Sequence, residues 1–271
     1  MSSRTKNLLK KYKIFPKKWL GQNFLISKEV LRKIVEAAEI SKKDKILEIG
    51  PGIGNLTIEL AKRAKKVIAV EKDKRMIEIL KENLKDFKNV KIVQGDILKL
   101  EPRSYTLKTY KVVANIPYYL TSRLIRKFLE TKNKPKSMVL MVQKEVAQRI
   151  CAKPPKMNLL AVSVQFYAKP KIISFVPKDC FWPKPKVDSA ILKISNLKTQ
   201  SSKLKELFFK IVKAGFSHPR KQLINNLSKG LKIEKEKVKK WLLENKIKPE
   251  KRAENLTVED WLKLIKNLKI L

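Results

Sequence analysis

Cysteine and histidine are scarce in this 271-residue chain, which has two cysteines and one histidine. Cys151, Cys180 and His218 are too few for a zinc cluster, and a single pair of thiols is not a disulfide framework. No recognisable nucleophile motif accompanies His218, which argues against a triad hydrolase. The composition therefore predicts a protein of a reducing compartment without a metal site, with His218 as a surface or capping residue.

Glycine, proline and long apolar runs are also limited. The 7 glycines and 13 prolines leave no room for a long low-complexity linker, so we expect the whole chain to fold. No apolar run approaches the roughly 20 residues that span a bilayer, and the lysine-rich first 18 residues do not form a signal peptide. We therefore expect a cytoplasmic protein with no membrane partner.

Acidic residues are few compared with basic ones, at 25 against 64, which gives a net charge of +39. This excess is larger than solubility requires, and polyanions would relieve its self-repulsion. A lysine-biased proteome is the alternative explanation for the excess. Even then, so basic a surface would bind RNA at low salt, so we expect nucleic acid as the partner.

Short β-branched runs alternate with helical patterns between residues 45 and 194, which predicts a mostly parallel sheet covered by helices. Apolar residues at helical spacing in residues 56–64 and 75–84 supply the crossovers. After residue 197 the helical spacing continues without strands, and Thr257 and Asp260 have the spacing of a capping box. Seven strands are predicted, at residues 45–49, 66–70, 90–93, 111–114, 137–142, 171–176 and 190–194.

The glycine-rich segment Gly50-Pro-Gly-Ile-Gly54 joins the first strand to a helix. Glycines let the backbone turn sharply and approach a ligand, although such a turn alone could be purely structural. Glu71 and Asp96 follow the next two strands, where one carboxylate can accept ribose hydroxyls and the other the amine of an adenine. Three features at the carboxyl edge of one sheet together predict an adenosyl pocket.

The segment Asn115-Ile-Pro-Tyr118 follows the fourth strand. An adenine amine is a poor nucleophile because its lone pair is delocalised, so catalysis requires acceptors that orient it. The side-chain oxygen of Asn115 and the carbonyl of Pro117 can each accept one amine hydrogen, and Tyr118 can stack on the base. Phe181 can supply a second stacking face for a flipped base, although a core role is the simpler alternative. An ordinary strand end with a proline turn is the structural alternative for the whole segment.

Five ordered motifs carry a resemblance to a known family, from about residue 17 to the C-terminus. The chain resembles the KsgA-type small-subunit ribosomal RNA adenine dimethyltransferases. It departs from the family pattern at Pro154-Pro-Lys-Met157 and at Arg123, where proline is common. The motifs are Gly21-Gln-Asn-Phe-Leu25, Glu48-Ile-Gly-Pro-Gly-Ile-Gly54, Asn115-Ile-Pro-Tyr118, Phe181-Trp-Pro-Lys-Pro-Lys-Val-Asp-Ser189, and Phe216-Ser-His-Pro-Arg-Lys221 before Asn225-Asn-Leu227.

The resemblance implies a class I, Rossmann-like α/β methyltransferase that uses S-adenosylmethionine. The change of pattern after residue 196 divides it into a catalytic domain at residues 1–197 and a small all-helical domain at 198–271. The resemblance also implies dimethylation of two adjacent adenosines in a hairpin near the end of small-subunit ribosomal RNA, on the immature subunit. We expect a monomer. The catalytic residues implied are Asn115, Pro117, Tyr118 and Phe181; those at the cofactor are Gln22, Asn23, Leu25, Gly50, Gly52, Glu71, Asp96, Ile97 and Asn115; candidates for RNA contacts are Lys17, Lys18, Arg123, Arg220 and Lys221.

Two other functions remain open. The related large-subunit adenine methyltransferases of macrolide resistance share the Asn-x-Pro-Tyr chemistry, but Phe216-Ser-His-Pro-Arg-Lys221 resembles the small-subunit family better. A nucleic-acid-binding assembly or transcription factor on the same scaffold is the second, and the intact Asn115, Tyr118 and Glu71 argue against it.

Overall fold

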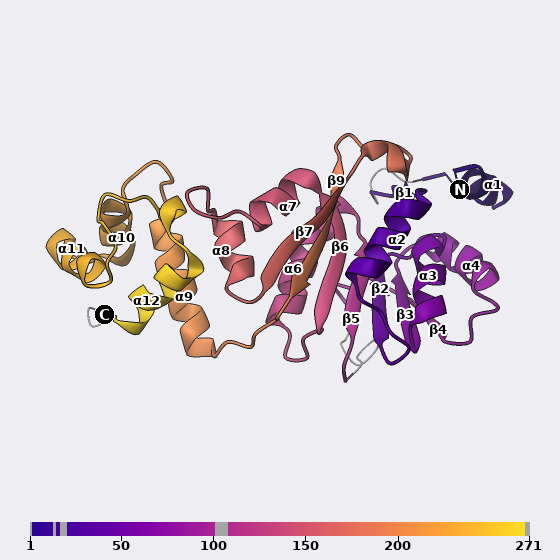
Figure 1. Ribbon diagram of the computed structural model, residues 1–271, viewed down its shortest axis with the longest axis horizontal. Coiled ribbons are helices and arrows are strands. Elements are labelled where there is room, and N and C mark those ends of the chain that lie inside the picture. Colours follow the sequence, from indigo (N-terminus) through magenta and orange to yellow (C-terminus); the bar gives the residue numbers. More distant parts are fainter. Residues whose placement is uncertain (1, 13–14, 17–20, 101–107, 269–271) are drawn as a thin grey trace. The chain divides into compact units, whose positions relative to one another are not determined.

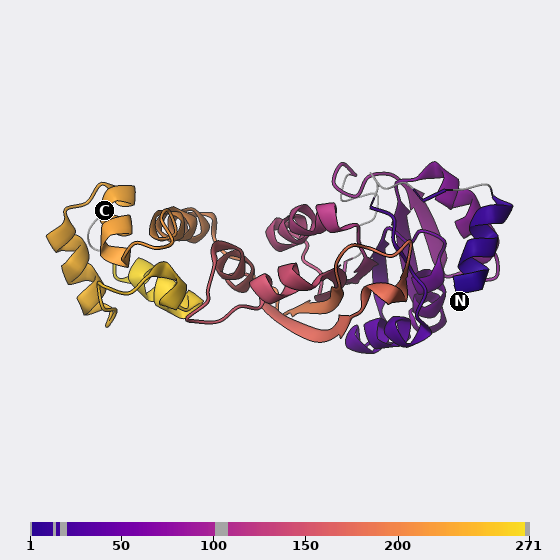
Figure 2. The same ribbon diagram turned by 90° about the horizontal axis from the view of Figure 1, so that it is seen from above.

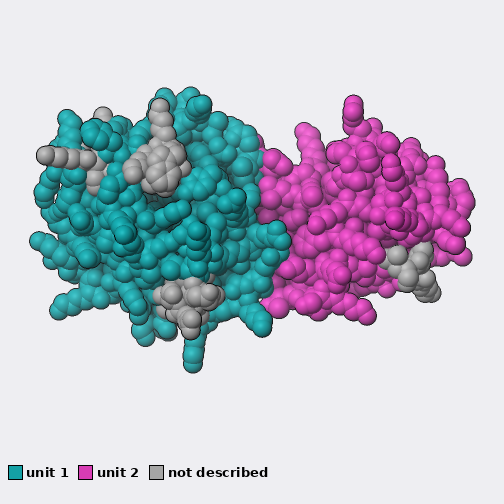
Figure 3. All heavy atoms as spheres, turned by 180° about the vertical axis from the view of Figure 1, so that it is seen from behind, with its two compact units in different colours: residues 1–147, 169–197 teal, residues 148–168, 198–271 magenta. Residues whose placement is uncertain are grey.

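The computed structural model describes residues 2–12, 15–16, 21–100 and 108–268 (Figure 1). Contacts divide the chain into two compact units (Figure 3). The α/β unit comprises residues 1–147 and 169–197, and the helical unit comprises residues 148–168 and 198–271. The predicted functional boundary between residues 197 and 198 stays a prediction.

A seven-stranded sheet forms the centre of the α/β unit, in the order β4-β3-β2-β5-β6-β9-β7. β9 runs antiparallel to both of its neighbours, and the other strands run parallel to one another. All seven predicted strands are therefore confirmed. They are β2 (Lys45–Ile49), β3 (Lys66–Glu71), β4 (Val90–Gln94), β5 (Lys111–Asn115), β6 (Ser137–Gln143), β7 (Lys169–Val176) and β9 (Ser189–Ser195).

The central strands have runs of consecutive apolar residues because helices cover both faces of the sheet, as Figure 2 shows. Val112, Val113 and Ala114 of β5 are fully buried in succession. An alternating pattern would have marked a strand with one face in water. The helices of this unit are α1 (Ser2–Lys11), α2 (Lys28–Ala37), α3 (Asn55–Arg63), α4 (Lys74–Asn83) and α6 (Thr121–Glu130); α7 (Lys144–Ile150) lies at the boundary of the units.

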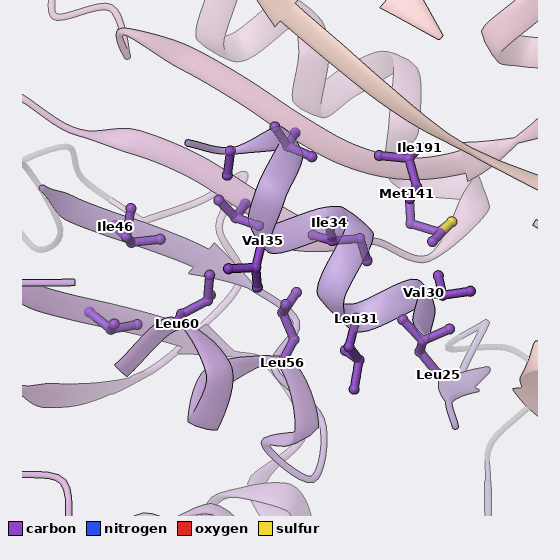
Figure 4. Close-up of a cluster of buried hydrophobic side chains, with 14 of the residues drawn as sticks. Leu25, Val30, Leu31, Ile34, Val35, Ile46, Leu56, Leu60, Met141 and Ile191 are labelled. Atoms are coloured by element: carbon purple, nitrogen blue, oxygen red, sulfur yellow. The ribbon is translucent and has the colours of Figure 1, made fainter. Parts of the chain in front are cut away.

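One apolar core lies between the sheet and the helix pair α2 and α3 (Figure 4). Leu31 and Ile34 of α2 and Leu60 of α3 are at most 2% exposed. α2 begins where the Ser27 hydroxyl accepts a hydrogen bond from Val30 N at 3.3 Å. This packing fixes the two segments that enter the carboxyl edge of the sheet, one before α2 and one before α3.

A second sheet of two short strands was not predicted. β1 (Phe24–Leu25) pairs antiparallel with β8 (Phe181–Trp182), so that Leu25 lies opposite Phe181. Strands of two residues have no periodicity, so only the tertiary structure shows them. The pairing brings the motif near residue 22 to the motif that begins at Phe181.

The helical unit contains α8 (Leu159–Gln165), α9 (Ser202–Gly215), α10 (Leu223–Leu231), α11 (Lys235–Glu244) and α12 (Val258–Lys266). Trp241 and Trp261 are fully buried in its core. A Cβ at Gly215 would lie 2.4 Å from the Trp261 ring, so this helix crossing requires glycine. The predicted capping box is confirmed, since Thr257 and Asp260 exchange side-chain and backbone hydrogen bonds. None of the helices in the described ranges is long and apolar enough to cross a membrane.

Candidate active site

A cleft of about 190 Å³ lies at the carboxyl ends of β2, β3 and β5. β2 is the strand at which the order of the parallel sheet reverses, because β3 follows it on one side and β5 on the other. Crossovers leave such a strand in opposite directions, which opens a crevice outside its carboxyl end. The lining residues all belong to the α/β unit.

The glycine turn forms one wall of the cleft. Gly50, Gly52 and Gly54 have positive φ angles of +66°, +58° and +89°, which a side chain would strain. A Cβ at Gly52 would also lie 3.1 Å from the Phe24 ring, so β1 can close over the turn only because glycine is present. The turn leads into α3, whose first residue is Asn55.

Glu71 ends β3 and is 7% exposed. Its Oε2 accepts a hydrogen bond from Gly52 N at 3.0 Å, and its Oε1 accepts from Lys72 N and Asp73 N at 2.8 Å each. Burial raises the pKa of the Glu71 carboxyl, and the three backbone hydrogen bonds offset burial only in part. With these donors in place, Oε2 can accept one further hydrogen bond from a ligand in the cleft.

Glu48 also lines the cleft, although its motif did not predict a separate role for it. It is 1% exposed, and its Oε2 has no hydrogen-bond partner among the described residues. Burial raises the pKa of Glu48 to about 8, the charge of Glu71 adds to this effect, and the neighbouring Thr57 hydroxyl opposes it. The ligand-free protein therefore holds a neutral carboxylic acid beneath the glycine turn below that pH.

We expect Glu48 to make the unfolding free energy depend on pH. A folded-state pKa above the unfolded value of 4.5 stabilises the fold fully below pH 4.5, and this contribution is lost as pH rises through about 8. Each unit of pKa shift corresponds to about 1.4 kcal/mol. Glu48→Gln, which stays neutral, should therefore gain stability relative to the native chain as pH rises from 5 to 8.

Thermal unfolding of the ligand-free protein at several pH values measures this effect. The exposed Glu78 on α4 provides the matched control, and Glu78→Gln should follow the native pH dependence. An unchanged difference between Glu48→Gln and the native chain at pH 5 and pH 8 would show that Glu48 does not titrate in this window.

Asp96 follows β4 and lines the cleft. In the strand order, β4 lies on one side of β2, and β5, which carries Asn115, lies on the other. The Asp96 carboxylate accepts hydrogen bonds from Leu98 N and Lys72 Nζ, each at 3.0 Å. Burial alone would raise the pKa of Asp96, but these two hydrogen bonds and the charges of Lys72 and Lys99 hold it below its ordinary value. Asp96 is thus a charged acceptor at the rim.

Asn115 is the last residue of β5 and lines the cleft. Its Nδ2 donates a hydrogen bond to the Asn23 carbonyl at 3.2 Å, which fixes the side-chain plane and leaves Oδ1 as an acceptor. Gln22, the residue before Asn23, donates a hydrogen bond from Nε2 to Asp73 Oδ2 at 2.9 Å. Gln22 and Asn23 are thereby tied to the ends of β3 and β5.

Pro117 and Tyr118 continue the segment along the cleft. The Pro117 carbonyl accepts from Leu120 N at 2.9 Å, so one lone pair remains for the proposed amine hydrogen. The Tyr118 hydroxyl lies 2.7 Å from Ser189 Oγ, which is fully buried at the start of β9. Burial raises the pKa of the Tyr118 phenol, so it stays neutral and its ring is anchored at the far end.

Phe181 both lines the cleft and belongs to the apolar core, with 3% of its surface exposed. Its stacking role stays a prediction, because the ring is covered mainly by protein. All other predicted catalytic and cofactor residues also line this one cleft: Gln22, Asn23, Leu25, Gly50, Gly52, Glu71, Asp96, Ile97, Asn115, Pro117 and Tyr118.

The candidates for RNA contacts belong to different parts of the chain. Arg123 lines the cleft and is exposed. Arg220 and Lys221 are exposed residues of the helical unit, after α9. Lys17 and Lys18 lie outside the described residues.

The motif around His218 is held within the helical unit by Asn226, which is 2% exposed. Asn226 Nδ2 donates to the carbonyls of Gly215 at 2.7 Å and His218 at 2.9 Å. Asn226 thus gives this motif a structural function, and His218 itself is exposed. In the described ranges, no group of three or more His, Cys, Asp or Glu side chains could hold a metal ion.

Sequence reasoning missed Asp73 and Tyr119 as cleft residues. Asp73 follows Glu71 by two positions, and its role as the N-cap of α4 gives it an ordinary structural explanation. Tyr119 directly follows Tyr118, and the exposure that distinguishes the two tyrosines is invisible in the sequence.

The strand order with one antiparallel strand, the glycine turn and the acidic residues at the ends of β3 and β4 define the class I methyltransferase fold. Two solved structures agree. The superposition on the 23S ribosomal RNA methyltransferase ErmE covers 91% of this chain and 99% of the ErmE chain, with 27% sequence identity and a TM-score of 0.77. The superposition on a dimethyladenosine transferase from Plasmodium falciparum covers 89% of this chain and 95% of that chain, with 32% sequence identity and a TM-score of 0.74.

The sequence comparisons identify the family. A model described as ribosomal RNA adenine dimethylase matches residues 16–269. A relative from Dehalococcoides mccartyi (strain CBDB1), named ribosomal RNA small subunit methyltransferase A, is 46% identical over 97% of this chain and 92% of its own. A relative of the same name from Clostridium botulinum is 42% identical over 96% of each chain. The chain belongs to the ribosomal RNA adenine dimethylase family.

Proposed function

We propose that this protein dimethylates two adjacent adenosines in a hairpin near the end of small-subunit ribosomal RNA, with S-adenosylmethionine as the methyl donor. One observation carries the proposal: Asn115 to Tyr118 share a single cleft with the glycine turn and Glu71. Family membership and relatives named ribosomal RNA small subunit methyltransferase A support the choice of substrate.

The charge of the cleft fits S-adenosylmethionine. The carboxyl groups of Glu71, Asp73 and Asp96 line it, against two basic residues, in a protein whose net charge is +39, and the buried Glu48 beneath the glycine turn adds no charge to this count. An acidic concavity in so basic a protein favours a cationic ligand. When bound, S-adenosylmethionine supplies an electrophilic methyl group on a sulfonium. The residues that would hold it are Gln22, Asn23, Leu25, Gly50, Gly52, Glu71, Asp96, Ile97 and Asn115.

The residues of the segment after β5 orient the adenine amine. Asn115 Oδ1 and the free lone pair of the Pro117 carbonyl each accept one amine hydrogen, which directs the nitrogen lone pair into the cleft. The Tyr118 ring, held at its hydroxyl by Ser189, supports the base. No strong base is required, because the amine becomes acidic on methylation and releases its proton to water.

Methylation of small subunits from cells that lack the gene tests the proposal. Purified protein with labelled S-adenosylmethionine should label the small-subunit RNA, and primer extension should stop at two adjacent adenosines. The same mapping in cells with and without the gene should give the same two positions. Absence of label from every ribosomal RNA would contradict the proposal.

Methylation of large-subunit RNA is the second candidate, and the likeness to ErmE at 27% identity supports it. Relatives at 40–46% identity are named for the small subunit, which favours the first candidate. Naked large-subunit RNA offered beside small subunits in one reaction separates the two, because the labelled RNA identifies the substrate.

RNA affinity should fall steeply with salt. Each phosphate that a lysine or arginine neutralises releases counterions, so log K falls linearly with log salt by about 0.7–0.9 per phosphate contact. We expect the affinity for small subunits to drop by on the order of a hundredfold or more between 50 and 200 mM salt. Filter binding measures it, and a salt-insensitive complex would contradict the electrostatic part of the proposal.

We further propose that the protein acts in the cytoplasm as a monomer on immature small subunits, with residues 1–197 as the catalytic domain and residues 198–271 as a helical domain. The excess of basic residues and the substrate class support this setting. Arg220 and Lys221 remain proposed phosphate contacts of the helical domain, and Lys17 and Lys18 those of the N-terminal region.

A further inference from the structure

Tyr119 is exposed at the cleft, with 55% of its surface accessible. The other aromatic side chains that line the cleft, those of Phe24, Tyr118 and Phe181, are all buried or partly buried. The Tyr118 hydroxyl is tied to Ser189, whereas the Tyr119 hydroxyl makes no hydrogen bond to a described residue. An aromatic ring therefore faces solvent directly beside the proposed catalytic segment.

The Tyr119 ring lies near Gly21, whose φ is +60°. A Cβ at Gly21 would lie 3.5 and 3.6 Å from Cδ1 and Cε1 of Tyr119, and 3.2 Å from the Pro117 Cβ. The ring thus packs along the backbone of the segment that also carries Gln22 and Asn23. One side of the ring is therefore near the backbone at Gly21, while more than half of the side chain stays accessible.

Two cations lie at the same rim. Arg123, four residues after Tyr119 and on the first turn of α6, lines the cleft, is exposed and makes no ion pair with a described residue. Lys72, whose side chain is 53% exposed, is paired with Asp96. The hydrogen bond and the charge of Asp96 raise the pKa of Lys72, burial opposes them, and Tyr119 adds a smaller increase.

An exposed aromatic ring and an exposed guanidinium that line one cleft are a combination that binds nucleotides, since the ring can stack on the base and the cation can bind the phosphate. An adenosine that enters the cleft leaves the base stack, so its neighbour in the RNA loses a stacking partner. A ring at the rim, next to the residues that hold the target amine, can replace that partner.

We propose that Tyr119 and Arg123 form a second nucleotide subsite, which holds the nucleotide next to the target adenosine in the RNA strand. Tyr119 stacks on the neighbouring base, and Arg123 binds the phosphate beside it. The subsite rests on the proposed function and adds the positioning of the strand to it. Because two adjacent adenosines are the proposed target, one of them occupies this subsite while the other is methylated.

Kinetics on unmethylated small subunits test the subsite. Tyr119→Ala should raise KM for the subunit on the order of tenfold or more, as loss of base stacking does, while the Kd for S-adenosylmethionine from calorimetry stays native. Tyr119→Phe keeps the ring and should restore most of the loss. Phe175→Ala is the matched control, because Phe175 is 49% exposed on β7 and does not line the cleft.

The salt dependence of RNA affinity tests the role of Arg123. Arg123→Gln should lower the slope of log Kd against log salt by about one, as loss of a phosphate contact does, whereas Tyr119→Ala should leave that slope unchanged. The subsite is wrong if Tyr119→Ala matches Phe175→Ala, if Tyr119→Phe loses as much as Tyr119→Ala, or if the Arg123→Gln slope is native. Failure of the proposed function would look different, because the native protein itself would not methylate the subunit.

Discussion

Asn115→Ala should lower kcat for methyl transfer on the order of a hundredfold or more, as removal of a well-placed hydrogen-bonding partner from a desolvated site does. Asn115 Oδ1 is oriented by the hydrogen bond from Nδ2 to the Asn23 carbonyl at 3.2 Å. Alanine removes both the acceptor for the adenine amine and the tie to Asn23. Affinity for the small subunit should hold, because an uncharged side chain contributes little to electrostatic docking.

Single-turnover kinetics with saturating cofactor separate the chemical step from binding. Some loss of cofactor affinity is expected as well, since Asn115 supports the segment that carries Gln22 and Asn23. Asn89→Ala is the matched control, because Asn89 is also a partly buried asparagine that donates to backbone carbonyls, those of Ala61 and Ala64. It lies outside the cleft lining, so it should lose stability but keep the native rate.

A folded Asn115→Ala protein that dimethylates small subunits at near the native rate would overturn the mechanism. That outcome would favour a nucleic-acid-binding factor on a methyltransferase scaffold. A large loss of RNA affinity with an unchanged single-turnover rate would instead assign Asn115 to docking. The two outcomes are distinct because rate and affinity are measured separately.

Glu71→Ala should weaken S-adenosylmethionine binding by on the order of ten- to a hundredfold, the equivalent of about 1–3 kcal/mol for buried hydrogen-bonding groups left unpaired. The carboxylate serves the ligand and the protein together, since it accepts from Gly52 N, Lys72 N and Asp73 N. Its loss removes the acceptor for the ribose and also releases the glycine turn from β3. We therefore expect a lower unfolding temperature alongside the weaker binding.

Glu71→Gln separates these two effects. Glutamine keeps one acceptor oxygen, but its amide group meets backbone N–H donors that need an acceptor. It should be less destabilised than Glu71→Ala and still bind cofactor weakly. Isothermal calorimetry gives the affinity, the exposed Glu78→Gln serves as the control, and a native Kd in folded Glu71→Ala would remove Glu71 from the site.

The chemistry of the site was readable from the sequence because it resides in short, local motifs. Strand ends carry Asn115 and Glu71, and the register of a parallel sheet puts all such ends on one edge. Every described residue predicted at the cofactor or the reacting amine lines the same cleft. Their individual roles stay predictions that the variants above test.

Contacts between segments that are distant in the chain could not be predicted from the sequence. The β1–β8 pairing joins Leu25 to Phe181 across more than half of the chain, and two-residue strands carry no pattern. The Gln22–Asp73 hydrogen bond and the Gly21–Tyr119 packing depend on how those segments meet. No local pattern distinguishes an aromatic ring that will be covered from one that will face solvent.

The strand and helix pattern, the glycine turn and the residue types at the strand ends could be predicted from the sequence, because periodicity and backbone conformation are local properties. The protonation state of each carboxyl group depends on the folded surroundings. Burial without a full set of partners makes Glu48 a neutral acid below about pH 8, while the hydrogen bonds from Leu98 N and Lys72 keep Asp96 charged. Both are carboxyl groups at the same edge of the sheet, and only the surroundings that the fold gives them set their charge.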